Sequence, residues 1–137
     1  MIKSNLMTRR KLLASMTASA FLPYSQFLSA AENKMRCALM ILSTPYTHDD
    51  EVDYEDLAKE VAFCAQCGIE GVVWPQNSSE QRYLSQEERI KGFEVIAKAS
   101  EGTGMATVFG VQADDTEGML GYAKVAESLN PDGMIAI

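Results

Sequence analysis

Polar side chains directly follow two apolar runs, and they are the residues of this chain best suited to bind a ligand. Asn77 and Ser78 come just after the apolar run at residues 71–74, and Thr44 follows the apolar run at residues 35–42. Hydroxyl and amide groups can donate hydrogen bonds to a carboxylate or carbonyl oxygen. In parallel α/β folds ligands bind at the carboxyl ends of the strands. We therefore predict that Thr44, Asn77 and Ser78 bind substrate, with ordinary use in turns as the alternative.

Other groups with potential chemistry fit structural roles better. Cys64 and Cys67 have the spacing of a redox pair, which would make the chain a thiol oxidoreductase. Gly68 places them at the carboxyl end of a helix, where the dipole disfavours a thiolate, so we expect helix packing instead. The single histidine, His48, leaves little scope for a metal site or a catalytic triad within this chain. The acidic stretch at residues 49–53 lacks the glycine of a calcium loop, so no metal is expected.

Strands and helices alternate in the predicted structure that must position these residues. Apolar runs without polar alternation predict buried strands, and possible helix caps stand at Asp53, at Ser85 with Glu88, and at residues 114–116. The expected order is strand 35–42, helix 54–67, strand 71–74, helix 86–100, strand 106–111, a helix from about 116 to 130, and strand 134–137. This repeat predicts an α/β fold, either an open doubly wound sheet or a (β/α)8 barrel.

Each helix is expected to bury one apolar stripe against the sheet. The predicted stripes are Leu57, Val61, Cys64 and Ala65 in the first helix, and Ile90, Phe93, Ile96 and Ala97 in the second. The third helix contains Gly118 and Gly121, which weaken it by roughly 1 kcal/mol each relative to alanine.

The first 31 residues have the layout of an export signal. Arg9 and Arg10 precede a mildly apolar run at residues 12–22, and small residues follow at 29–31. No acidic residue occurs before Glu32. Paired arginines before a weakly hydrophobic core resemble a twin-arginine leader. We therefore expect a signal peptide at residues 1–31, a folded domain at 32–137, and a bacterial periplasmic or exported protein, with a short amphipathic terminal helix as the alternative.

Composition limits the class of protein further. The chain has 137 residues, enough for one modest domain, and a net charge of -7. Removing residues 1–31 takes away four basic residues and no acid, which brings the charge to about -11 and disfavours nucleic-acid binding. No stretch approaches the ~20 apolar residues of a transmembrane helix, so no membrane contact is expected after the signal is removed. Three cysteines do not make a disulfide framework.

Four motifs follow one another along residues 35–137. They are ALMILSTPY at residues 38–46, DDEVDYEDLA at 49–58, LSQEER at 84–89 and NPDGMIAI at 130–137. In this order and spacing they resemble the opening of the dihydrodipicolinate synthase / N-acetylneuraminate lyase family. The resemblance implies a (β/α)8 barrel, commonly a homo-oligomer, of which this chain covers about the first four βα units.

The same resemblance implies a Schiff-base-forming lyase or synthase that acts on pyruvate or a related small-molecule 2-keto acid without a metal or organic cofactor. In that family a lysine on the sixth strand forms the imine and a tyrosine just after the fourth strand relays protons. A Gly-[Thr/Ser]-Thr-Gly-Glu loop after the second strand holds the carboxylate. Counted back from Leu84, that loop falls on residues 76–80 of this chain, QNSSE.

This chain departs from the family pattern in two ways. Both glycines of the loop are replaced, by Gln76 and Ser79, and Asn77 stands at the first hydroxyl position. The chain also ends before the expected tyrosine and lysine, and the four lysines at positions 59, 91, 98 and 124 fall on predicted helices. We expect no catalytic residue in this chain, which would be the front half of a longer protein or the product of an interrupted gene. The alternative function is a non-catalytic, decayed homologue with at most ligand binding.

Overall fold

The computed structural model describes residues 37–136, so the predicted signal peptide at residues 1–31 lies outside the described residues. The compact unit that contains them runs from Met35 to Ile137. Its elements alternate as predicted. They are β1 (Leu39–Ile41), α3 (Tyr54–Gln66), β2 (Gly71–Trp74), η1 (Asn77–Ser79), η2 (Gln81–Tyr83), α4 (Gln86–Ser100), β3 (Ala106–Gly110), α5 (Thr116–Ser128) and β4 (Gly133–Ile135).

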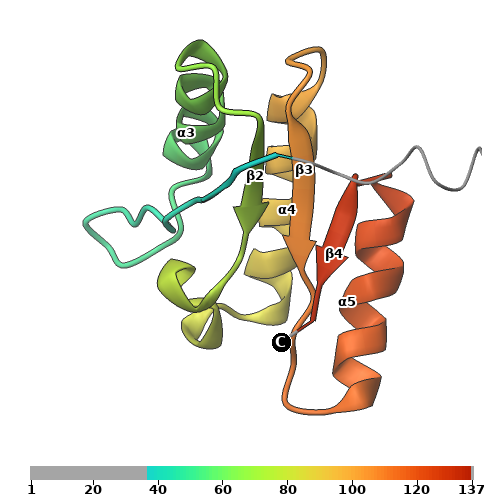
Figure 1. The fold of residues 1–137 in the computed structure, drawn as a ribbon. Coiled ribbons are helices and arrows are strands. Elements are labelled where there is room, and N and C mark those ends of the chain that lie inside the picture. The colour runs from blue at the N-terminus through green and yellow to red at the C-terminus, as the bar shows by residue number, and fades with distance from the viewer. Residues whose placement is uncertain (1–36, 137) are drawn as a thin grey trace, which may run out of the picture. The chain divides into compact units, whose positions relative to one another are not determined.

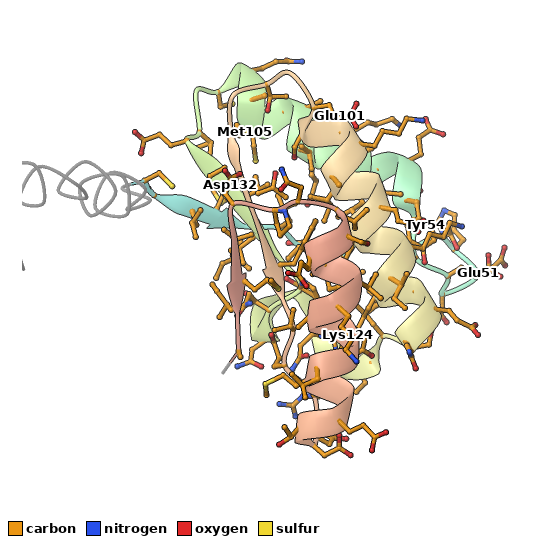
Figure 2. All side chains as sticks on the ribbon, turned by 90° about the vertical axis from the view of Figure 1, so that its right-hand side faces the viewer. Glu51, Tyr54, Glu101, Met105, Lys124 and Asp132 are labelled. Carbon is orange, nitrogen blue, oxygen red and sulfur yellow. The ribbon has the colours of Figure 1, made fainter. Side chains whose placement is uncertain are left out.

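The four strands form one parallel sheet in the order β1-β2-β3-β4. The three α-helices within residues 37–136 lie on the same side of the sheet, as the two views agree (Figures 1 and 2). A doubly wound sheet has helices on both faces and reverses its strand order. Sequential order with helices on one side is the arrangement of a barrel. The predicted fold class, the first βα units of a (β/α)8 barrel, is confirmed.

Each α-helix begins at a cap residue that the sequence predicts. Asp53 accepts from the backbone amides of Glu55 and Asp56, and Ser85 and Glu88 form the predicted capping box. Of the candidates before the third helix, Asp115 is the cap, because its carboxylate accepts from the Gly118 amide at 2.7 Å. Side-chain oxygens at these positions satisfy amides that have no partner within the helix.

An aromatic cluster joins the sheet to α4. Trp74 and Phe109 are register partners on β2 and β3, so they project from the same face. The ring of Phe93 on α4 lies 4.6 Å from that of Phe109 and packs edge-on against Trp74 at 6.2 Å. Aromatic pairs with these geometries add to the free energy gained by burying the rings.

Carboxylates connect neighbouring strands at the opposite end of the sheet. Glu70, just before β2, accepts a hydrogen bond from the Ala38 amide at 3.1 Å. Met105 and Asp132 precede β3 and β4 and lie near the same end of the sheet in Figure 2. Asp132 Oδ2 accepts a hydrogen bond from the Thr107 amide at 2.8 Å. This end therefore has a structural role. Thr44, Asn77 and Ser78 lie at the opposite end of the sheet, where the strands have their carboxyl ends.

The first strand is shorter and less buried than predicted. Of the predicted strand at residues 35–42, residues 35 and 36 lie outside the described residues. Among the others β1 spans three residues, and Met40 and Ile41 are 46% and 48% exposed. The physical reason is that β1 is an edge strand among residues 37–136, with β2 as its one neighbour. The last strand, β4, is likewise an edge strand and is shorter than predicted.

The buried stripe of α4 is rotated relative to the prediction. Ile90 is only partly buried, whereas Arg89 is buried together with Gly92, Phe93 and Ile96. Gly92, Phe93 and Ile96 follow Arg89 by three, four and seven residues, and this spacing places all four on one helix face. Hydrophobicity alone favours Ile90 over a charged residue at this face, and the tertiary contacts of Arg89 reverse that preference.

The two cysteines of α3 differ in environment. Cys64 is buried in the apolar stripe as predicted, but Cys67 is exposed at the helix end, so the expectation of packing is wrong for Cys67. Burial, with Glu60 and Cys67 nearby, raises the pKa of the Cys64 thiol. A raised pKa opposes the thiolate that a redox pair requires.

Candidate functional site at the carboxyl ends of the strands

The ends of β1 and β2 are joined by a short chain of hydrogen bonds. Ser79 Oγ donates to the Leu42 carbonyl at 2.5 Å, and Thr44 Oγ1 donates to the Ser79 carbonyl at 2.6 Å. Trp74 Nε1 donates to Thr44 Oγ1 at 3.0 Å, and the backbone amide of Gln76 donates to Ser79 Oγ at 3.1 Å. The loop after β2 is therefore fixed to the end of β1, so hydrogen bonds hold the backbone at the carboxyl ends of these two strands in place.

The three predicted binding residues lie at this junction. Asn77 and Ser78 are exposed on η1, directly after β2, and Thr44 is half-buried after β1. The hydroxyl of Thr44 is already used as donor and acceptor within the fold. Asn77 and Ser78 therefore present the more accessible polar side chains, and ligand contact by the three residues stays a prediction.

Sequence reasoning missed four buried polar side chains in the same region. Ser79 is fully buried, and Gln76, Gln112 and Arg89 are 6%, 5% and 4% exposed. Two signals could have found them. Gln76 and Gln112 each stand two residues beyond the end of their strand, and Arg89 lies four residues before Phe93, on the same helix face.

Arg89 connects α4 to the end of β3. Its Nη2 donates to the Gly110 carbonyl at 3.1 Å, and its Cζ lies 3.8 Å from the ring centroid of Tyr122 on α5. Burial lowers the pKa of Arg89, partly offset by Tyr122. Within residues 37–136 no carboxylate forms an ion pair with this guanidinium. A backbone carbonyl and an aromatic face thus replace the usual carboxylate partner.

A cavity of about 390 Å³ borders this buried arginine. Its lining is mostly polar: Gln81, Arg82, Leu84, Arg89, Gln112, Ala113, Asp114 and Tyr122. The cavity is large enough for a small molecule and lies beyond the ends of β2 and β3.

Among the described residues no group of three or more His, Cys, Asp or Glu side chains is placed to hold a metal. No helix in residues 37–136 is both long and apolar enough to cross a membrane.

A sequence model of the dihydrodipicolinate synthetase family matches residues 34–137. The chain belongs to this family. Its similarity to a 4-hydroxy-tetrahydrodipicolinate synthase of Methanosarcina mazei is 32% identity over 100 residues, which are 73% of this chain and 33% of the relative. The corresponding synthase of Methanosarcina acetivorans is 33% identical over the same lengths. The chain thus spans about a third of the length of the curated relatives it matches.

Solved structures of family members share the fold. A dihydrodipicolinate synthase from Aquifex aeolicus superposes with a TM-score of 0.70 and 24% identity, covering 74% of this chain and 34% of that one. The N-acetylneuraminate lyase of Proteus mirabilis gives 0.70 and 23%, covering 75% and 35%. These likenesses support the barrel-type arrangement of the four strands, and at this identity they show the fold alone.

Proposed function

We propose that this chain contributes the substrate-binding strand ends of a Schiff-base-forming lyase or synthase that acts on pyruvate or a related 2-oxo acid. The supporting observation is that Asn77 and Ser78 lie exposed at the carboxyl end of β2, on a loop fixed to Thr44. Family membership supplies the reaction class, because curated relatives are named 4-hydroxy-tetrahydrodipicolinate synthase.

The chemistry divides between an amine and a set of hydrogen-bond donors. An imine formed from the 2-oxo group stabilises a neighbouring carbanion as an enamine. Donors such as the Ser78 hydroxyl and the Asn77 amide would neutralise the carboxylate next to it. Among residues 37–136 the four lysines lie on helices, as predicted: Lys59, Lys91, Lys98 and Lys124. Within the proposal, the imine-forming lysine therefore comes from outside the described residues.

Reductive trapping tests the proposal. The protein from its native host is incubated with pyruvate and borohydride, and the reduced adduct is located by peptide mass. We expect one adduct per chain, on a lysine outside residues 37–136, and weaker trapping in the double variant Asn77→Ala, Ser78→Ala. The matched control is Ser128→Ala, a change of the same type at an exposed helical position at the far end of α5. Failure to trap any adduct would count against Schiff-base chemistry.

A binding-only homologue is the second candidate function. It is favoured by the loop at residues 76–80, which lacks both glycines of the family motif, and by the positions of the lysines on helices. Glycine lets backbone amides approach an anion closely, so Gln76 and Ser79 change how the loop can hold one. Saturable binding of pyruvate without any trapped adduct would support this candidate.

Export and assembly are further parts of the proposal. We propose that residues 1–31 direct the protein through the twin-arginine pathway and that the family barrel assembles into a homo-oligomer. Cell fractionation of the double variant Arg9→Lys, Arg10→Lys tests export, with Lys3→Arg as control. We expect the double variant to stay inside the cell, and an unchanged distribution would contradict the export proposal. Analytical ultracentrifugation of the purified protein tests assembly, and a monomer would contradict it.

A further inference from the structure

The only tryptophan of the chain connects the buried core to the candidate site. Trp74 is the last residue of β2 and is fully buried. Its ring packs edge-on against Phe93 on α4, in a core without room for the ring to turn. The direction in which the indole N–H points is therefore set by the core and not by the loops at the strand ends.

The two hydrogen bonds of the Thr44 side chain each have a fixed direction. The indole nitrogen of Trp74 is a donor only, so Thr44 Oγ1 accepts from it at 3.0 Å. The Ser79 carbonyl has no hydrogen, so the Thr44 hydroxyl donates to it at 2.6 Å. A hydroxyl carries a single hydrogen. Thr44 consequently has none left for a ligand carboxylate, and its remaining lone pair would face the negative charge.

Ser79 carries this constraint to the residues that the proposed function uses. Its hydroxyl donates to the Leu42 carbonyl and its carbonyl accepts from Thr44, so side chain and backbone are both held by the segment at the end of β1. Asn77 and Ser78 directly precede Ser79 in η1, which is a single short turn of 3₁₀ helix. A displacement of Ser79 would therefore displace the two exposed side chains as well.

We propose that Trp74 and Thr44 are positioning residues for the hydrogen-bond donors of Asn77 and Ser78. Trp74 orients the Thr44 hydroxyl, and this hydroxyl holds the Ser79 carbonyl and with it η1. Thr44 thus has a positioning role in place of the direct ligand contact that the sequence predicts. Donors that are held in place before a ligand arrives lose less conformational freedom on binding. The inference rests on the proposed function, because that function assigns the carboxylate to Asn77 and Ser78.

Two substitutions of Thr44 test the hydroxyl. Thr44→Val removes it and keeps the shape of the side chain, whereas Thr44→Ser keeps it. Pyruvate is titrated into the ¹⁵N-labelled full chain, with the backbone amides of Asn77 and Ser78 as NMR reporters. We expect Thr44→Val to raise the Kd for pyruvate about three- to tenfold, the contribution of one hydrogen bond, and Thr44→Ser to stay within about twofold of the wild type.

Amide hydrogen exchange without ligand separates positioning from a ligand contact and from a general structural role. We expect Thr44→Val to speed exchange of the Ser79 and Glu80 amides, which donate within the turn at 2.9 Å and 3.1 Å, and to leave the amides of α4 unchanged. Weaker pyruvate binding with unchanged exchange in η1 would mean that Thr44 contacts the ligand, which overturns the proposal. Faster exchange throughout the fold, or no change in η1 and in the Kd, would overturn it as well.

Trp74→Phe removes the indole donor and keeps an aromatic ring in the core. It should weaken pyruvate binding as Thr44→Val does, and the double variant should bind no more weakly, because the two residues act in one chain of hydrogen bonds. Phe109→Leu is the matched control, since it alters the same aromatic cluster without a hydrogen bond to Thr44, and it should leave the Kd unchanged. Additive losses, or an equal loss in the control, would overturn the proposal. If Trp74→Phe does not fold, the two Thr44 variants decide alone.

The measurements without ligand also separate the positioning role from the proposed function. If pyruvate shifts no amide of the wild type but η1 is loosened in Thr44→Val, the 2-oxo acid proposal fails and the positioning of η1 stands. If pyruvate shifts the Asn77 and Ser78 amides but neither Thr44→Val nor Trp74→Phe changes its Kd, the positioning role fails and the proposed function stands.

Discussion

The indole ring of Trp74 on β2 lies directly against the Cα atom of Gly92 on α4. A Cβ atom on Gly92 would overlap the ring atoms Cη2 and Cζ3. Trp74 is fully buried between the sheet and the helix, so the ring has no free space into which to move. The absence of a side chain at Gly92 therefore sets how closely α4 approaches the sheet.

Gly92→Ala should destabilise the fold although alanine is the better helix former. The propensity gain is about 1 kcal/mol, whereas overpacking a core costs about 1–3 kcal/mol. We expect a lower midpoint of urea unfolding. The matched control is Gly121→Ala on α5, where no atom lies within 4 Å of the added Cβ, and it should raise the midpoint. Equal effects of the two substitutions would show that Trp74 yields to the new methyl group.

The elements of this fold follow from local signals in the sequence. The boundaries of α3 and α4 fall within one residue of the prediction, because Asp53 and the Ser85–Glu88 capping box mark where each helix begins. The bounds of β2 agree with the prediction and those of β3 differ by one residue, whereas the edge strands β1 and β4 are shorter than predicted. Strand length depends on neighbouring strands, and β1 has a neighbour on one side only among residues 37–136.

The candidate site was only partly predictable. Asn77 and Ser78 could be placed at a strand end because a strand, a proline and a helix start surround them in sequence. Arg89 on α4 donates to the carbonyl of Gly110 at the end of β3, 21 residues later in the chain. Gln112 donates to the carbonyl of Pro75, 37 residues earlier. Local signals place Gln112 just beyond the end of its strand and Arg89 on the helix face of Phe93, but the groups that they contact there follow from tertiary packing.

Ser79 should contribute more to stability than its neighbour Ser78. Its hydroxyl is fully buried, donates to the Leu42 carbonyl and accepts from the Gln76 amide. Ser79→Ala leaves both groups without a partner, so we expect a loss of about 1–3 kcal/mol in the free energy of unfolding. Ser78→Ala changes an exposed side chain and should stay within about 0.5 kcal/mol of the wild type. Urea unfolding of both variants checks this, and similar losses would contradict the hydrogen-bond assignment.

Asp115 and Asp114 provide a second matched comparison. Asp115 accepts from the Gly118 amide at the start of α5, whereas Asp114 lies one residue earlier and is exposed. Asp115→Ala should cost about 1 kcal/mol, the usual contribution of an N-cap. Asp114→Ala should have a much smaller effect on the urea midpoint. A larger loss for Asp114→Ala would mean that α5 begins one residue earlier.

Cys64 should react slowly with alkylating reagents. Iodoacetamide at pH 8 should modify exposed Cys67 first, because Cys64 is buried and its pKa is raised. Peptide mass spectrometry at increasing reaction times measures the two rates. Comparable rates would contradict the burial of Cys64.

The raised pKa of Cys64 also fixes the sign of a pH dependence. The folded state favours the neutral thiol, so the stabilisation is fully present below the ordinary pKa of about 9.0 and is lost as the pH rises through the higher folded value. Between pH 8 and 10.5 the free energy of unfolding should therefore fall more steeply in the wild type than in Cys64→Ala. Cys67→Ala retains the burial of Cys64, the largest cause of its raised pKa, and should stay closer to the wild type than Cys64→Ala does. The opposite order of slopes would mean that the folded state favours the Cys64 thiolate, which is what a redox-active pair in α3 would require.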